Sequence, residues 1–287
     1  MLWRGRRQSS NVEDRRGIGG KGIAVGGGLG AVIIAVIVYL MGGNPSDVLN
    51  VDQASQTQQA APLSPADDEA AQFTAVILAD TEDIWAQLFS EMNKEYVAPR
   101  LVMFTQTTQS GCGFASQASG PFYCPGDSKV YIDLSFFNEM KTRFNAAGDF
   151  AQAYVVAHEV GHHVQHLLGI TDKVDAQRGR LSEKEMNRLS VKLELQADFL
   201  AGVWAHYVAL KKDPQMNTSV IEPGDIDEAL NAASAIGDDR LQQQSQGYVV
   251  PDAFTHGTSA QRIAWFKKGY ETGDIRQGDT FNDPSLN

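Results

Sequence analysis

The chain of 287 residues has very little cysteine, since Cys112 and Cys124 are its only two. Zinc sites built from thiolates place cysteines in C-x-x-C pairs or beside histidines, and neither arrangement occurs here. Both cysteines lie in one glycine- and serine-rich stretch. If that stretch lies outside the cytoplasm, an oxidising compartment favours a disulfide over two buried free thiols. We therefore expect a Cys112–Cys124 disulfide and no thiolate metal site.

The sequence also lacks the excess of basic residues that nucleic-acid binding requires. Its 24 lysines and arginines are outnumbered by 35 acidic residues, which gives a formal net charge of -11 at pH 7. Six of the basic residues lie within residues 1–21, so the rest of the chain is more acidic still. Because phosphate backbones are bound by clustered lysine and arginine, this acidic body argues against a nucleic-acid partner.

No charged residue occurs between Lys21 and Asp47. The segment 22–43 is apolar and long enough to cross a bilayer, which takes about 20 such residues. A cleaved signal peptide, the alternative, needs a shorter apolar core and a small-x-small cleavage site. The basic residues before the segment predict a cytoplasmic head at 1–21, a transmembrane helix at 22–43 and a periplasmic or other extracytoplasmic body.

The remainder of the chain is predicted to form a linker and one domain. Residues 44–65 are rich in Gln, Ser, Ala and Pro and lack apolar periodicity, which is typical of a flexible linker. Residues 66–287 are expected to form an α+β domain that is mainly helical with a small β-sheet. Apolar spacing predicts helices at 67–92, from 135, and at 147–168, 182–210, 226–235, 238–246 and 259–270. It predicts strands at 101–105 and 129–134.

An H-E-x-x-H pattern lies within the predicted helix at 147–168. His158 and His162 are four residues apart, so on a helix they share one face. Their imidazoles can then bind one Zn²⁺ through nitrogen. Glu159 lies at the edge of that face, where its carboxylate can reach a metal-bound water without being a ligand. The motif predicts metal-assisted hydrolysis with Glu159 as the catalytic base.

Catalytic zinc usually takes three protein ligands, and Glu194 on the predicted helix 182–210 is the candidate for the third. Asp198 lies one turn further along the same face, where it can accept the free N–H of a zinc-bound histidine. A solvated helix face is the alternative for both acids, but their neighbours are apolar. Gly161 and Gly202 are expected to let helices approach closely.

The other histidines suit the metal less well. Helical geometry turns His163 away from the ligand face and leaves His166 at its margin, one turn further along. His206 is expected to be a packing or surface residue. His256 precedes a predicted helix, and there it could donate a hydrogen bond to the oxyanion that peptide hydrolysis creates. The alternative is that His256 is a surface loop residue beside the cap of that helix.

With these residues, the chain resembles the bacterial putative neutral zinc metallopeptidases, a family of membrane-anchored proteins with a short basic N-terminus. The resemblance covers nearly the full length and rests on residues 4–16, 120–125, 130–137, 158–162, 194–198 and 256–262. More broadly, HExxH followed by ExxxD is similar to the zincin peptidases. That likeness implies a zincin-like fold with the sheet beside the active-site helix. It implies one zinc ion on His158, His162 and Glu194, with Glu159 as base and Asp198 behind the ligands.

The sequence therefore predicts a membrane-anchored zinc metallopeptidase that hydrolyses a protein or peptide substrate. Strand 130–134 could offer an edge to an extended substrate, as in strand addition. Two alternatives are a non-catalytic, metal-stabilised binding or scaffold protein and a zinc amidase that acts on cell-wall peptides. The presence of Glu159 argues against the first, because zinc ligation alone needs no base at that position.

Overall fold

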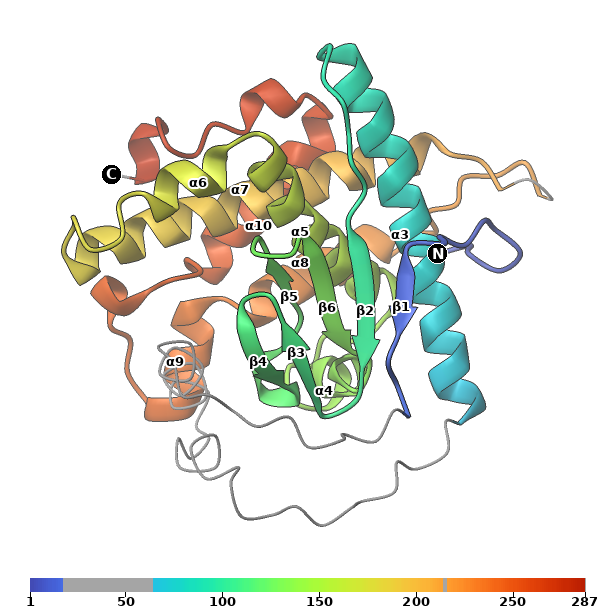
Figure 1. The fold of residues 1–287 in the computed structure, drawn as a ribbon, viewed down its shortest axis with the longest axis horizontal. Coiled ribbons are helices and arrows are strands. Elements are labelled where there is room, and N and C mark those ends of the chain that lie inside the picture. The colour runs from blue at the N-terminus through green and yellow to red at the C-terminus, as the bar shows by residue number, and fades with distance from the viewer. Residues whose placement is uncertain (18–63, 214–215, 287) are drawn as a thin grey trace.

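The computed structural model describes residues 1–17, 64–213 and 216–286 and has the predicted α+β class, with helices around a small sheet (Figure 1). The predicted transmembrane helix at 22–43 and the linker up to residue 63 lie outside the described residues. Within the described ranges, no helix combines the length and the apolarity that a membrane crossing needs.

The main sheet has the strand order β1–β2–β6–β5. Its strands are β1 (Val12–Asp14), β2 (Arg100–Phe104), β5 (Phe122–Cys124) and β6 (Lys129–Asp133). β2 is parallel to both of its neighbours, β1 and β6, whereas β5 runs antiparallel to β6. The expectation that strand 130–134 offers a free edge is wrong for Val130 and Tyr131, because β2 and β5 pair with both sides of β6 at these residues. The edge strand at this end of the sheet is β5.

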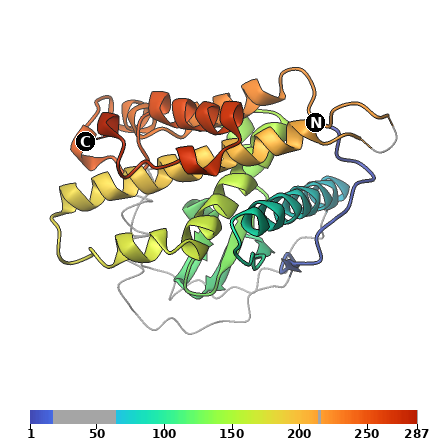
Figure 2. The same ribbon diagram turned by 90° about the horizontal axis from the view of Figure 1, so that it is seen from above.

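Helices cover one side of the sheet, and Figure 2 shows α5 between the sheet and the long helix α7. α5 packs against α3, α7 and α8, while α10 packs against α7 and α8. The helices are α3 (Pro65–Glu91), α4 (Phe136–Thr142), α5 (Asp149–Leu167), α6 (Ile170–Asp175), α7 (Glu183–Leu210), α8 (Asp225–Ala235), α9 (Asp238–Gln246) and α10 (Ser259–Thr272). Short 3₁₀ turns lie at Gln117–Ser119, Pro251–Ala253, Ile275–Gln277 and Pro284–Leu286.

Local sequence explains where the two helices that matter most begin and end. The Ser182 side chain accepts from the backbone N–H of Glu185, and the Glu185 carboxylate bonds back to Ser182, so the predicted capping box opens α7. Helix α5, which carries the H-E-x-x-H motif, is followed by Gly169 at its C-terminal end. Gly169 adopts φ 69°, a left-handed conformation that glycine reaches without steric cost. α5 therefore ends at the predicted glycine.

Residues 1–17 belong to the same folded unit as the helices. β1 pairs with β2, and Trp3 packs edge-on against Phe73 of α3 with ring centroids 5.5 Å apart. Arg6 donates from Nη2 to Asp80 Oδ1 over 2.6 Å, and both side chains are buried. Arg4, Arg6 and Arg7, which the sequence assigned to a separate head, thus pair with acids of α3, and residues 1–17 pack on the domain.

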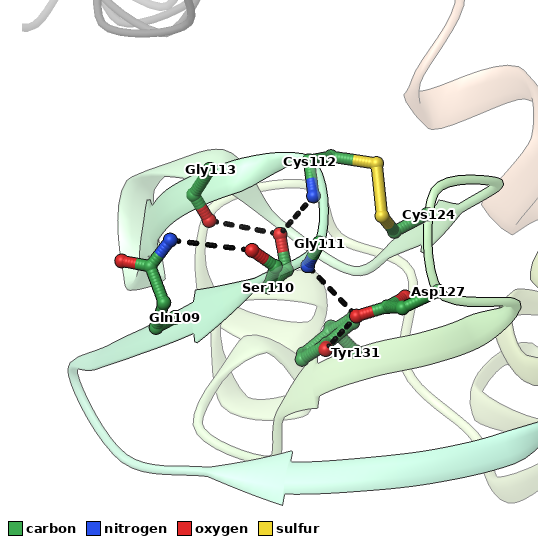
Figure 3. Close-up of a disulfide and its surroundings, with 8 residues drawn as sticks. All are labelled: Gln109, Ser110, Gly111, Cys112, Gly113, Cys124, Asp127 and Tyr131. Carbon is green, nitrogen blue, oxygen red and sulfur yellow. Dashed lines mark hydrogen bonds between the residues drawn. A yellow bond between two sulfur atoms is a disulfide. The ribbon is translucent and has the colours of Figure 1, made fainter. Parts of the chain in front are cut away.

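A disulfide joins Cys112 to Cys124, which confirms the predicted pairing (Figure 3). Cys112 lies at the turn of a hairpin formed by β3 (Thr107–Ser110) and β4 (Gly113–Ser116), and Cys124 ends β5. Asp127 accepts hydrogen bonds from the Gly111 N–H at 2.7 Å and the Tyr131 hydroxyl at 2.6 Å. The hairpin is therefore fastened to the edge of the main sheet.

Two glycines allow the helices to approach closely, as predicted. A Cβ on Gly161 of α5 would lie 3.0 Å from the carbonyl oxygen of Ala197 on α7. A Cβ on Gly202 of α7 would overlap the carbonyl oxygen of Phe266 on α10. The crossings of α7 with α5 and with α10 therefore both require a position without a side chain.

We expect Gly202→Ala to lower the free energy of unfolding by about 1–3 kcal/mol, because the overlap with a backbone oxygen outweighs the gain of about 1 kcal/mol in helix propensity. Gly161→Ala, with its longer contact, is the matched comparison and should cost less. Urea unfolding followed by circular dichroism measures both values. Equal stability of Gly202→Ala and the wild type would contradict this account of the α7–α10 crossing.

Candidate metal centre

α5 and α7 bring together the three predicted ligands where they cross. His158 Nε2 lies 3.2 Å from Glu194 Oε2, and His162 Nε2 lies 3.4 Å from Glu194 Oε1. One ligand atom from each residue can be chosen so that all lie within 4.8 Å of one another. Although burial raises the pKa of Glu194, the two facing imidazoles hold it well below its usual range. The carboxylate is therefore ionised between them.

The donor set fits a zinc ion. Zinc binds imidazole nitrogen and carboxylate oxygen at about 2.0–2.2 Å in tetrahedral geometry, which places neighbouring donors about 3.3 Å apart. Each imidazole Nε2 lies about that far from one oxygen of the Glu194 carboxylate, 3.2 Å from Oε2 for His158 and 3.4 Å from Oε1 for His162, so the carboxylate is within reach of a metal held by both rings. Three protein ligands leave one position of a tetrahedron open, which is the arrangement of catalytic rather than structural zinc. His158, His162 and Glu194 are thus the residues that would hold the metal.

Asp198 lies behind His158, as predicted. Its Oδ1 is 2.9 Å from His158 Nδ1, and Asp198 is fully buried at 0% exposure. Burial raises the pKa of Asp198, but Arg262 and His158 lower it further than burial raises it. The ionised carboxylate accepts the Nδ1–H of His158, which turns Nε2 toward Glu194. In the metal-free protein, burial opposes protonation of His158, yet Asp198 and Glu194 raise its pKa to about 10.

The sequence did not identify Arg262 as the counter-ion of Asp198. Arg262, on α10, is 1% exposed and donates from Nε to Asp198 Oδ2 over 2.8 Å and from Nη2 to Oδ1 over 3.0 Å. It also donates to the hydroxyl of Tyr154 over 3.2 Å. A buried carboxylate needs a buried cation, and Arg262 beside the apolar residues Ile263, Ala264 and Trp265 was the available signal.

Gln165 was also missed. Its side-chain oxygen lies 2.8 Å from Nδ1 of His162, on the side of the ring opposite Glu194. Gln165 is three residues after His162 on the same helix, a spacing at which side chains meet. Spacing alone does not single it out, because a glutamine on a helix is ordinarily solvated. The two ligand histidines therefore have different partners, a carboxylate for His158 and an amide for His162.

Glu159 lies between the ligands and the edge of the sheet. It is buried, and burial raises the pKa of its carboxyl group, an effect that the neighbouring charges of His158 and His162 oppose. The backbone of Tyr123 in β5 lies near the Glu159 carboxyl group and also lowers its pKa. The proposed base thus lies beside both β5 and the imidazoles of α5.

Comparison with known proteins agrees with this geometry. A family described as putative neutral zinc metallopeptidase matches residues 1–281. This chain belongs to that family. A protein of Escherichia coli strain K12, named uncharacterized protein YpfJ, is 52% identical over 290 residues, which cover 98% of this chain and 99% of that one. An uncharacterized protein of Mycobacterium bovis is 46% identical over 195 residues, covering 67% and 65% of the two chains. No solved structure gives a significant match.

In this member of the metallopeptidase family, three histidines lie away from the ligand cluster, as expected. His163 is buried, with Nε2 2.7 Å from the carbonyl oxygen of Val97 and Nδ1 3.0 Å from the hydroxyl of Tyr123. His166 faces an exposed acid at 3.6 Å, and His206 donates to a backbone carbonyl over 2.8 Å. His163 therefore has a structural role, which is to join α5 to β5.

The structure leaves both interpretations of His256 open. Thr258 caps α10 through a capping box with Gln261, which fits a loop residue beside a helix start. The side chain of His256 is 45% exposed, and its Nδ1 lies 3.2 Å from Asp238 Oδ1. Burial lowers the pKa of His256, but Asp238 and the charge of Glu194 raise it overall. His256 is thus close enough to the ligand cluster for the charge of Glu194 to raise its pKa.

The pKa of His163 predicts how stability depends on pH. Burial lowers this pKa to about 4, although the Val97 carbonyl opposes the shift, whereas an unfolded chain titrates near its ordinary 6.5. The free energy of unfolding that depends on neutral, buried His163 is therefore fully present above about pH 6.5, and it is lost as the pH falls toward about 4. Between about pH 7.5 and pH 5, the wild type should lose about 2 kcal/mol more unfolding free energy than His163→Gln.

Urea unfolding of the zinc-free protein at both pH values measures this difference. His206→Gln is the matched control and should follow the wild type, because it removes a different histidine. Parallel pH profiles for the wild type and His163→Gln would mean that His163 takes up its proton as readily in the folded protein as in the unfolded one.

Proposed function

We propose that the protein is a zinc-dependent endopeptidase with a zincin-like fold. The observation that carries the proposal is the convergence of both Nε2 atoms on one ionised carboxylate, with Glu159 adjacent and outside the ligand set. A metal site that only stabilised the fold would need a fourth protein ligand and no buried carboxylate beside it. This arrangement favours hydrolysis over the binding or scaffold alternative.

The chemistry divides between the metal and the residues around it. A zinc ion in this site supplies Lewis acidity, which makes an attacking water more acidic and polarises the scissile carbonyl. Glu159 accepts the proton of that water as its oxygen bonds to the carbonyl carbon, and then delivers the proton to the leaving amine as the C–N bond breaks. Because burial raises the pKa of Glu159, its carboxylate is a stronger proton acceptor than an exposed one.

The position of strand β5 favours an extended peptide as the substrate over a compact molecule. Its hydrogen-bonding edge away from β6 is not used by the main sheet, and the backbone of its residue Tyr123 lies near enough to Glu159 to lower the pKa of that carboxyl group. An extended peptide that added to this edge as a further strand would therefore pass beside the base. His256 would then supply an oxyanion donor, because Asp238 holds its Nδ1 and its raised pKa favours the protonated ring.

We expect Glu159→Gln to abolish peptide hydrolysis while zinc remains bound, since the amide cannot accept the proton and the three ligands are unchanged. Cleavage of an unstructured protein such as casein, together with the metal content of the purified protein, measures both properties. Removal of zinc by a chelator should stop wild-type cleavage, and added zinc should restore it.

Glu95→Gln is the matched control, because it makes the same change at an exposed position. It should cleave as the wild type does. Full activity of Glu159→Gln would remove the proposed base. An inactive wild type that binds zinc would instead favour the scaffold alternative, or a substrate such as cell-wall peptides that casein does not represent.

We further propose that this domain works outside the cytoplasm and is attached to a membrane through residues 22–43. The disulfide supports an oxidising compartment. The docked N-terminal segment adds a constraint, because β1 and β2 can pair only on one side of a membrane. A paired β1 therefore excludes both a cytoplasmic N-terminus and a single membrane crossing at 22–43. We propose that residues 1–17 share the compartment of the domain and that residues 22–43 attach it to the membrane without a complete crossing.

A thiol reagent that cannot cross membranes should label Gln8→Cys and Glu95→Cys to the same extent in intact cells with a permeabilised outer envelope. Gln8 and Glu95 are both exposed, the first in the N-terminal segment and the second in the domain. Labelling of Glu95→Cys alone would place the N-terminus in the cytoplasm and would mean that β1 leaves the sheet.

A further inference from the structure

We propose that Gln165 and Gln196 form a hydrogen-bond relay that fixes the tautomer of His162, so that Nε2 of this ring carries the lone pair for the metal. The proposal rests on the proposed function, since it concerns the same metal centre. It assigns positioning roles to two residues that touch neither the metal position nor a substrate.

The relay begins at the buried side chain of Gln165, which is 0% exposed. Its Oε1 lies 2.8 Å from His162 Nδ1. Its Nε2 donates to the carbonyl oxygen of Leu193 over 2.7 Å and to Gln196 Oε1 over 3.1 Å. Both polar atoms of this amide therefore have partners, which a fully buried amide requires.

The orientation of each amide follows from a backbone carbonyl, which can only accept a hydrogen bond. The Leu193 carbonyl requires the NH₂ group of Gln165 on its side, and this turns Oε1 of Gln165 toward His162. Gln196 donates from Nε2 to the carbonyl oxygen of Gly278 over 2.7 Å, which likewise turns its own Oε1 toward Gln165. The relay thus runs in one direction, from His162 to Gly278.

The hydrogen bond between Gln165 and His162 decides which ring nitrogen of His162 carries a hydrogen. Because Oε1 of Gln165 accepts, Nδ1 of His162 must carry the hydrogen. When a metal binds, Nε2 is then the nitrogen that gives up its hydrogen and supplies the lone pair, and this atom lies 3.4 Å from Glu194 Oε1. A ligating histidine is commonly fixed by the hydrogen bond that its other nitrogen donates. Here an uncharged amide takes that position, so no second buried carboxylate is added to the site.

The relay also connects the two helices that carry the ligands. Gln165 lies on α5, and both of its acceptors lie on α7, one of them the carbonyl of the residue before Glu194. Gln196 is two residues beyond that ligand and is buried. The hydrogen bonds that Gln165 makes to His162, Leu193 and Gln196 therefore also hold His162 at a set position relative to Glu194.

The test uses Gln165→Met, which keeps the length of the side chain and removes its hydrogen bonds. The first readout is the Nδ1–H of His162 in the zinc-loaded protein, from its ¹H–¹⁵N signal and its rate of exchange with water. The wild type should show a protected Nδ1–H, and the variant should show one that exchanges faster. The second readout is zinc affinity by competition with a chelator, which should fall about 10–100-fold.

Gln87→Met makes the same change at an exposed position and should leave both readouts unchanged. If Gln165→Met fails to fold, Gln196→Met breaks the relay one bond further out and should shift the same readouts by less. An unchanged exchange rate of the Nδ1–H and an unchanged zinc affinity in the folded variant would overturn the proposal. Because both readouts are taken without substrate, a wild type that lacks peptidase activity would count against the proposed function alone.

Discussion

The contact between α5 and α7 is the constraint on which the site depends. Two ligands lie on one helix and the third lies on the other, so their separation is set by how closely the two backbones approach. Gly161 removes the side chain that would hold α7 away, and the carbonyl of Ala197 lies against the space so created. A single carboxylate can then face both imidazoles at 3.2 and 3.4 Å. The site is therefore a property of helix packing as much as of the motif.

Charge balance explains why a third helix is needed. Asp198 is an ionised group in an apolar interior, and such a group is costly to bury unless a cation is buried with it. Arg262 of α10 is that cation, and it reaches Asp198 because Gly202 lets α10 lie against α7. The chain of contacts runs from α10 through Asp198 to His158. The position of one metal ligand thus depends on the C-terminal part of the chain.

The sequence predicted the parts of this site that periodicity can reveal. His158 and His162 follow from helical spacing, and Glu194 and Asp198 follow from acids among apolar neighbours. The roles of Gln165 and Arg262 were not predicted, because they depend on tertiary partners that spacing does not specify. The three-residue strands β1 and β5 are too short for a period to be read. The basic N-terminal residues were assigned to a cytoplasmic head because they precede an apolar segment. Their pairing with α3 was not predicted, because those partners lie far away in sequence.

Helix α5 sets the distance between the base and the edge that we propose for the substrate. One face carries the two ligand imidazoles, and His163, turned away from that face, bonds to Tyr123 of β5. The backbone of the same tyrosine lies near Glu159 and lowers the pKa of its carboxyl group. The disulfide fastens the end of β5 to the β3–β4 hairpin and so limits its movement away from the helix (Figure 3). Helix α5 therefore positions the metal ligands relative to the proposed substrate edge. Hydrolysis requires precise placement of this kind.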